Sequence, residues 1–274
     1  MRTAAGILGS SHPVPAAGVT VIVVLLGVAV GLDPARLVVL GAVMALDQIS
    51  VGLSNDWLDV ERDRAAGRRD KPVARGDVSV GVVRAAALVS AIGSVALSPL
   101  LGLPFVLVHL VALAGGWSYN AWFKHGMLSP LPYLVSFGIL PALATTALPE
   151  PAAPAWWAVL AGALLGLAAH VANVLPDLAD DAATGVRGLP HRLGARGSTL
   201  VAGAALAGAA VALAVGIGPG IPTIAGLVVS LAASVAAVAL GLRGSRWAFR
   251  LVILAALVDV VLLVLAGPAI AVVD

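Results

Sequence analysis

The sequence contains no cysteine, and only 11% of its 274 residues are charged and 4% aromatic. The absence of cysteine excludes disulfides, thiolate metal sites and a cysteine nucleophile. The shortage of charge, together with 60% hydrophobic residues and a mean hydropathy of +1.04, excludes an ordinary soluble domain. The longest polar interval, 59–79, is too short to form a soluble domain of its own.

Long apolar runs fill most of the chain and predict transmembrane helices, because about 20 consecutive apolar residues cross a bilayer. We expect nine spans, at 13–32, 35–53, 80–101, 103–123, 129–148, 153–175, 198–217, 220–242 and 247–270. No good cleavage site follows the first run, so it reads as a span and not as a signal peptide. The prediction is one all-α integral membrane domain over residues 1–274.

The basic residues predict the orientation of this domain. With nine spans, all of the 16 lysines and arginines except Arg36 fall on the N-terminal side of the membrane. The positive-inside rule places that side, and with it the N-terminus, in the cytoplasm of a cell-membrane protein. The pI of about 9.5 follows from this bias and gives no reason to expect nucleic acid as a partner.

Two acidic stretches repeat one pattern at an offset of 118 residues. Both follow N-x3-D-x3-D-x3-G-x-R-x2-P-x3-G, in 55–76 and in 173–194. They follow the second and the sixth expected spans, which indicates an internal repeat of about four helices and places both stretches on the cytoplasmic side.

The spacing of the acidic residues predicts a metal site. If each span continues as a helix, positions i, i+4 and i+8 lie on one face, and the two faces carry Asn55, Asp56, Asp59 and Asp63, and Asn173, Asp177 and Asp181. Carboxylates gathered at a membrane boundary repel one another unless cations neutralise them. Carboxylate and amide oxygens suit Mg²⁺, which keeps positions open for phosphate oxygens.

Basic residues follow each acidic stretch and would complete a diphosphate site. They are Arg68, Arg69, Lys71 and Arg75 after the first stretch, and Arg187, His191 and Arg192 after the second. The alternative, that they reflect topology and contact with anionic lipid, explains any single arginine equally well.

The motif Asn55-Asp56-x2-Asp59-x3-Asp63 resembles the first aspartate-rich motif of the UbiA superfamily of intramembrane prenyltransferases. Asn173 and Asp177-x3-Asp181 resemble the second, and the resemblance covers essentially the whole chain. It implies nine helices around a central cavity. It also implies Mg²⁺-dependent transfer of an isoprenyl group from an allylic isoprenyl diphosphate to an acceptor, often an aromatic ring, with release of diphosphate.

The resemblance also assigns roles to residues. Catalysis and Mg²⁺ binding would fall to the five aspartates, with Asn55 and Asn173 as metal or diphosphate ligands. In 115–133, Tyr119, Asn120 and Lys124 stand at family-like positions. Tyr119 would stabilise an allyl cation and Lys124 would reach the diphosphate. An interfacial aromatic belt and an ordinary cytoplasmic lysine are the alternatives.

Other readings stay open at this stage. The same diphosphate site would serve isoprenoid cyclisation, or transfer to a non-aromatic lipid or sugar. A transporter is a remote alternative, because the carboxylates lie at helix ends and not at mid-membrane. Asp47 is expected in the acceptor pocket or in a structural hydrogen bond, whereas His12, His109 and His170 are read as packing or hydrogen-bonding groups.

Overall fold

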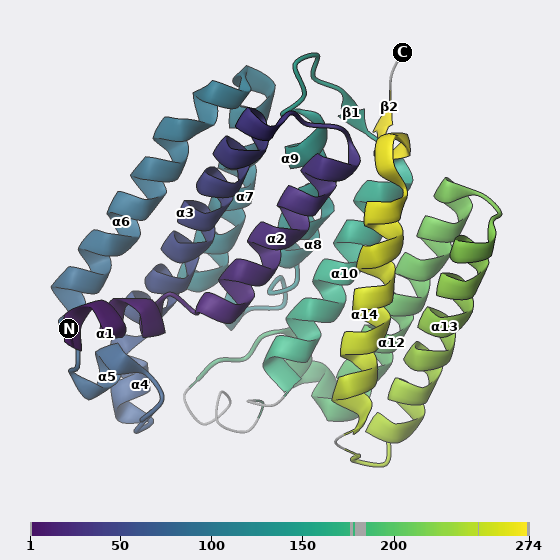
Figure 1. Cartoon of the computed structure of the whole chain (residues 1–274). Coiled ribbons are helices and arrows are strands. Elements are labelled where there is room, and N and C mark those ends of the chain that lie inside the picture. Colours follow the sequence, from purple (N-terminus) through teal and green to yellow (C-terminus); the bar gives the residue numbers. More distant parts are fainter. Residues whose placement is uncertain (1, 176–177, 179–184, 246, 273–274) are drawn as a thin grey trace.

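The computed structural model describes residues 2–175, 178, 185–245 and 247–272, and within these it is an assembly of helices (Figure 1). Seven segments are long and apolar enough to span a membrane. They are α3 (Pro34–Leu58), α6 (Val80–Leu97) with the 3-10 turn η1 (Ser98–Leu101), α7 (Leu103–Ala121), α10 (Trp156–Val174), α12 (Leu189–Ile217), α13 (Ile221–Gly241) and α14 (Trp247–Leu265). The protein is thus an all-α, multi-pass membrane protein.

The first expected span is preceded by a helix that the apolar pattern missed. α1 (Arg2–Ser10) is bent by 59° from α2 (Pro13–Ala29), and if the pair is one span the count rises to eight. His12, between them, has a positive φ of 50°. Pro13 starts α2, as proline's fixed φ favours at a first helical position.

The fifth expected span, 129–148, is broken into two helices. α8 (Leu131–Gly138) and α9 (Leu140–Thr145) meet at Ile139, directly before Leu140 and Pro141. Proline in a helix removes a backbone hydrogen bond, which agrees with the kink expected from the prolines of this segment. Together the two helices form an apolar segment shorter than 18 residues, so this segment does not meet the length of a span.

The remaining elements are short. α4 (Val60–Ala65), α5 (Pro72–Arg75) and η2 (Phe123–His125) lie in the connections that follow α3 and α7. The strands β1 (Ala153–Pro154) and β2 (Ala271–Val272) pair antiparallel, and η4 (Gly267–Ile270) leads into β2. This two-residue ladder is the one departure from the all-α expectation in the described chain.

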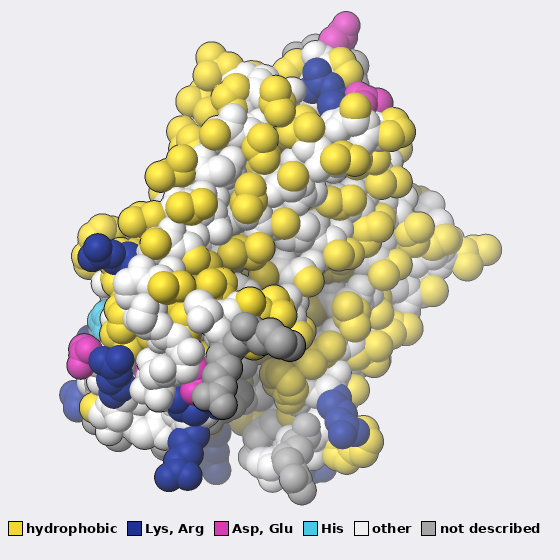
Figure 2. Space-filling model, turned by 60° about the vertical axis from the view of Figure 1, so that its left-hand side comes forward, with side chains coloured by type: hydrophobic (Ala, Val, Ile, Leu, Met, Phe, Trp, Pro, Cys, Tyr) yellow, Lys and Arg dark blue, Asp and Glu magenta, His cyan; other side chains and the backbone are white. Residues whose placement is uncertain are grey.

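The helices enclose a cavity. α2, α3, α7, α8 and α10 supply its lining, while α6 packs outside α3, and α12, α13 and α14 pack outside α10 (Figure 1). Its blind end rests on a buried apolar cluster that includes Leu26, Leu40, Phe105, Leu143 and Leu213. Figure 2 shows apolar side chains over the body of the molecule, with most Lys and Arg of this view gathered at the end that carries α4 and α5.

The two repeated stretches share backbone features where both are described. Gly67 and Gly185 both have positive φ, and so do Gly76 and Gly194. α5 begins with Pro72 and ends at Gly76; α12 begins at Leu189 and is kinked at Gly194. α12 therefore starts well before the apolar run that predicted it.

Candidate active site

Two connected cavities lie at the end of the bundle that carries α4 and α5. One, of about 410 Å³, is polar and is lined by charged residues that include Asp59, Asp63, Lys71 and Lys124. The other, of about 280 Å³, lies between the helices and is mainly apolar. Both are lined by His12, Asn55, Tyr119 and Asn173. A ligand with a charged head and an apolar tail would fit across this junction.

One oxygen of the first motif aspartate, Asp56, contacts both Lys71 and His12. Asp56 is 1% exposed, and its Oδ1 accepts a hydrogen bond from Lys71 Nζ. His12 Nε2 lies 2.8 Å from the same oxygen and 3.1 Å from Lys71 Nζ. The other oxygen, Asp56 Oδ2, is buried and has no hydrogen-bond partner in the described chain. One oxygen of this buried carboxylate thus receives no hydrogen bond from the described residues.

The second aspartate is also paired. Lys124 Nζ donates to Asp59 Oδ1, and Arg62 donates to Asp59 Oδ2 at 2.8 Å. Asn55 Nδ2 reaches the same Oδ2 at 3.3 Å. Burial lowers the pKa of Lys124, against the opposing effect of Asp59. Lys71, predicted from the basic run, and Lys124, implied by the resemblance, therefore each pair with a motif carboxylate.

The negative charge of the third motif aspartate, Asp63, has the most distant cationic partner of the three. Asp63 is 4% exposed, and within the described chain it forms one ion pair, with Arg62 at 4.0 Å. Burial raises its pKa. Such a carboxyl group gains from a nearby cation.

The end of α3 explains how the motif is presented. The helix ends at Leu58 and α4 begins at Val60, yet Asp59 N–H still donates to Asn55 O at 3.0 Å and Asp63 N–H to Asp59 O at 2.8 Å. The expected i, i+4 spacing therefore survives a break at Asp59, although the continuous helix does not.

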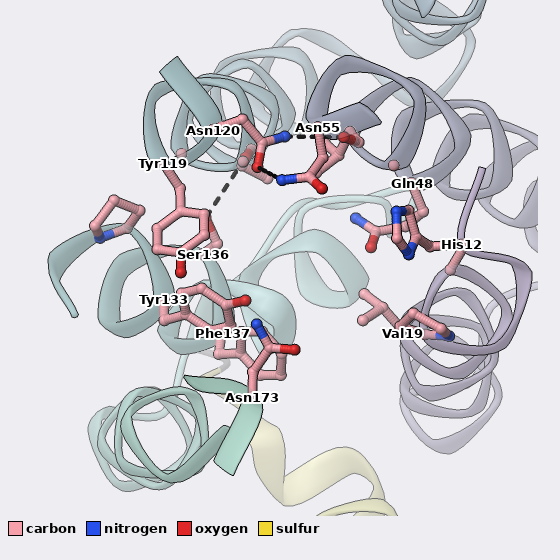
Figure 3. A pocket seen from close by; sticks show the side chains of 18 of the residues that line it. His12, Val19, Gln48, Asn55, Tyr119, Asn120, Tyr133, Ser136, Phe137 and Asn173 are labelled. Atoms are coloured by element: carbon pink, nitrogen blue, oxygen red, sulfur yellow. Dashed lines mark hydrogen bonds between the residues drawn. The ribbon is translucent and has the colours of Figure 1, made fainter. Parts of the chain in front are cut away.

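Asn120 acts on the site through Asn55. Its side-chain amide donates to Val51 O at 2.9 Å and Ser54 Oγ at 2.8 Å, and its oxygen accepts from Asn55 Nδ2 at 3.2 Å (Figure 3). Because the Asn120 amide nitrogen donates to two groups of α3, its oxygen faces Asn55. This oxygen accepts from Asn55 Nδ2 and so fixes the orientation of the Asn55 amide.

Tyr119 stands at the junction of the cavities and belongs to an aromatic cluster. Its ring meets Tyr133 edge-on with centroids 5.0 Å apart, and Tyr133 stacks on Phe137 at 5.9 Å. His170 contacts both tyrosine rings, and its Nε2 lies 3.1 Å from the buried Ser129 Oγ. The cluster forms one wall of the apolar cavity (Figure 3).

The basic residues expected around a diphosphate separate into two groups. Lys71 and Arg68 line the polar cavity, and Arg68 also donates to Asp70 at 2.9 and 2.7 Å, which lowers the pKa of Asp70 to about 2. Arg187 and Arg192 are exposed and do not line either cavity.

The second motif is visible only at its start. Asn173 is exposed into both cavities, opposite the α2 and α3 wall (Figure 3). Asp177 and Asp181 lie outside the described residues, as does Asp180. Within the described part of the chain, no group of three His, Asp or Glu side chains forms a metal-binding cluster.

His12 enters the site as a hydrogen-bonding group, one of the two roles expected for it from the sequence. The corner between α1 and α2 packs on Gly52 of α3, where a Cβ would lie 2.3 Å from Ser11 O. Gly52 lets the corner approach, and this approach brings His12 to Asp56. The sequence holds only a slight signal for this contact. A histidine stands directly before Pro13, and a glycine, Gly52, stands four residues before the first motif aspartate.

Solved structures share the fold. A UbiA homologue from Archaeoglobus fulgidus bound to GPP and Mg²⁺ aligns with a TM-score of 0.71 and 15% identity over 95% of this chain and 99% of the other. A homologue from Aeropyrum pernix K1 gives 0.69 and 18%, over 94% and 96%. A structure described as digeranylgeranylglyceryl phosphate synthase gives 0.69 and 16%, over 98% and 99%.

Sequence comparison gives the family. No curated protein matches the chain significantly. The model of the UbiA prenyltransferase family matches residues 16–251, most of the chain. With the fold and the first aspartate-rich motif in place, the chain belongs to the UbiA prenyltransferase family and is an enzyme of that family.

Proposed function

We propose that the protein transfers an isoprenyl group from an allylic isoprenyl diphosphate to an acceptor, an aromatic ring being the expected one, with Mg²⁺ as cofactor. One observation carries this proposal: a polar cavity rich in paired Asp and Lys opens directly into an apolar cavity. The likeness to homologues bound to GPP or DMAPP with Mg²⁺ supports the same donor class.

The first motif fits Mg²⁺. Asp56 Oδ2 is buried and has no hydrogen-bond partner among the described residues, and the buried carboxyl group of Asp63 has one distant ion pair there. Asp56, Asp59 and Asp63, with Asn55, would hold the ion, and Asp177, Asp181 and Asn173 are proposed to supply the second set. Mg²⁺ bound there would neutralise charge on the departing diphosphate.

The chain's own cations would share that task. Lys71 and Lys124 donate hydrogen bonds to motif carboxylates, and both line the polar cavity together with Arg68. All three would therefore lie near the diphosphate oxygens. Tyr119, at the junction, would face the allyl cation with its ring, since aromatic faces attract cations. The apolar cavity would keep water from that cation. Asn120 would orient Asn55, and Arg187 and Arg192 would act from the rim.

We also propose a single domain of nine spans with an internal repeat of about four helices, in which α1 with α2 and α8 with α9 complete the set. The end that carries α4, α5 and the N-terminus would face the cytoplasm. Because the chain lacks cysteine, Arg69→Cys and Arg36→Cys each provide one label site. An impermeant thiol reagent on intact cells should label only Arg36→Cys; labelling of only the other would reverse the orientation.

Transfer to a lipid acceptor is the second candidate, favoured by the fold shared with digeranylgeranylglyceryl phosphate synthase. The mass of the product separates this candidate, an aromatic product and a cyclised hydrocarbon.

The test is diphosphate release by purified protein in nanodiscs, with geranyl, farnesyl or geranylgeranyl diphosphate, with and without Mg²⁺. Phenols and lipid alcohols serve as acceptors, and mass spectrometry identifies products. Asp59→Asn should abolish release. Asp33→Asn, at the far end of α3 where asparagine keeps the helix cap, is the matched control and should retain it. Equal release by both variants would remove the motif from catalysis.

A further inference from the structure

The apolar cavity has two chemically different walls. Tyr119, Tyr133 and Phe137 form one wall, from α7 and α8. Gln48 of α3 and His12 at the start of α2 stand on the opposite side (Figure 3). A planar, partly polar molecule would lie between them with its ring against the aromatic wall and its polar group toward Gln48.

The described lining of this cavity lacks the four ordinarily charged residue types. Among the described residues it contains no Lys, Arg, Asp or Glu, and its polar groups are amides, hydroxyls and the His12 imidazole. The lysines and arginines near the site line the polar cavity instead. An ionised carboxylate or phosphate placed here would lose water without gaining a cation, which is strongly unfavourable.

The Gln48 amide is held in one orientation. Its Nε2 donates to Asp47 Oδ1 at 3.1 Å, and because a carboxylate only accepts, the amide nitrogen must face Asp47. The carbonyl oxygen, Oε1, makes no hydrogen bond to the described chain. Figure 3 shows the amide directed into the space between the two walls.

Asp47 lies among buried groups behind the cavity, and within the described chain neither its Oδ2 nor His109 Nε2 makes a hydrogen bond. Asp47 is 1% exposed, and His109 Nε2 lies 3.2 Å from its Oδ2. His109 Nδ1 lies 2.7 Å from Ser98 Oγ. None of the three lines either cavity, and Asp47 contacts the lining residue Gln48.

We propose that this cavity seats the acceptor, that the acceptor is uncharged, and that it donates a hydroxyl hydrogen bond to Gln48 Oε1. Asp47 is the positioning residue for Gln48. The inference rests on the proposed function and names its acceptor class. In the transfer, the allylic C–O bond breaks with its electron pair on diphosphate, and the acceptor atom supplies the pair for the new bond. The proton that the acceptor loses goes to the released diphosphate.

Matched acceptor pairs test the charge. Purified protein in nanodiscs, with Mg²⁺ and the donor that it cleaves, is given 4-hydroxybenzyl alcohol or 4-hydroxybenzoate, and kcat/KM is measured for each. We expect the neutral compound to be preferred at least about tenfold. Preference for the carboxylate, or release of diphosphate with neither compound prenylated, overturns the inference while leaving the diphosphate chemistry in place.

Variants at Gln48 test the contact. Gln48→Arg should shift the ratio at least about tenfold toward 4-hydroxybenzoate, whereas Leu128→Arg, which adds the same charge at an exposed position outside both cavities, should not. Gln48→Leu should raise KM for the alcohol roughly 2- to 12-fold, the effect of one neutral hydrogen bond, with kcat little changed. An unchanged KM overturns the contact.

Asp47→Asn tests the positioning role, because asparagine has similar shape but no longer dictates which way Gln48 faces. KM for the alcohol should rise as in Gln48→Leu, while the affinity for a non-hydrolysable thiodiphosphate donor stays constant. A loss of thermal stability with unchanged KM would make Asp47 merely structural. If the wild type releases no diphosphate from any donor, the proposed function fails, and this inference fails with it.

Discussion

Replacing Gly52 with alanine should displace the corner that carries His12. A Cβ at Gly52 would lie 2.3 Å from Ser11 O and 2.7 Å from Ser11 C, both backbone atoms that cannot rotate away. Gly41, on the same helix, provides the matched control, because its Cβ would meet only Val24 Cγ2 at 3.4 Å, an ordinary contact.

The magnitude follows from two opposing effects. Alanine in a helix interior gains up to about 1 kcal/mol over glycine in both variants. Overpacking at Gly52 costs roughly 1–3 kcal/mol, and Gly41 has no such cost. The propensity gain cancels in the comparison, so Gly52→Ala should be about 1–3 kcal/mol less stable than Gly41→Ala.

Thermal unfolding in one detergent measures this difference, at roughly 2–4 °C per kcal/mol for a chain of this size. Hydrogen exchange of the α1 amides should rise in Gly52→Ala only, because α1 is joined to the displaced corner. Equal midpoints and equal α1 protection in the two variants would refute the close approach of α1–α2 to α3 and, with it, the placement of His12.

Three further predictions concern single contacts. Lys71→Met should lower stability without Mg²⁺ by about 3 kcal/mol, since Asp56 stays buried without its ammonium partner, and Mg²⁺ should restore much of the loss in unfolding midpoint. Ser129→Ala should cost about 1–3 kcal/mol in thermal unfolding, because it leaves the His170 ring nitrogen and a backbone N–H unpaired in a buried site. The pKa of Asp70 is lowered from 3.8 to about 2 in the folded protein, so its ion pair stabilises the fold above pH 3.8 and is lost as the pH falls toward 2. In Asp70→Asn, the unfolding midpoint should therefore depend less on pH over that range.

Each of these has its own control. For Lys71, an identical Mg²⁺ response in variant and wild type would contradict the pairing with Asp56. For Ser129, Ser118→Ala removes a hydroxyl bonded only within its own helix and should change stability by less than about 0.5 kcal/mol. For Asp70, whose side chain is 60% exposed, the effect is small and should shrink further in high salt. If the unfolding midpoint of Asp70→Asn falls with pH as much as that of the wild type, other carboxyl groups cause the acid dependence.

The first motif was predictable because its spacing is a local property. Asn55, Asp59 and Asp63 stay linked by backbone hydrogen bonds even though the helix breaks at Asp59. Hydropathy located the long spans because an apolar run is also a local property, contiguous in sequence. It did not locate the start of α12, because the polar turns from Leu189 onward are helical without being apolar.

The contributions of His12 and Gln48 could not be predicted, because each depends on contacts between distant segments. His12 reaches Asp56 across 44 positions, and only the absence of a side chain at Gly52 allows it. Gln48 gains its orientation from Asp47, which in turn faces His109 on another helix. A single sequence shows these residues as isolated polar side chains in apolar runs, a pattern equally typical of structural hydrogen bonds.

The end of the bundle that carries α9 is closely packed within the described structure. Every residue of α9 is buried, Ala155 N–H ties to Ile270 O at 2.7 Å, and the apolar cluster around Phe105 and Leu143 fills the space beneath the cavity. Moving one charge through a membrane at 100 mV releases about 2.3 kcal/mol, so a polar hole through the bilayer would drain the energy that the cell stores there. If charged substrate and charged product pass only through the opposite end, the membrane would keep its voltage while the chemistry proceeds inside it.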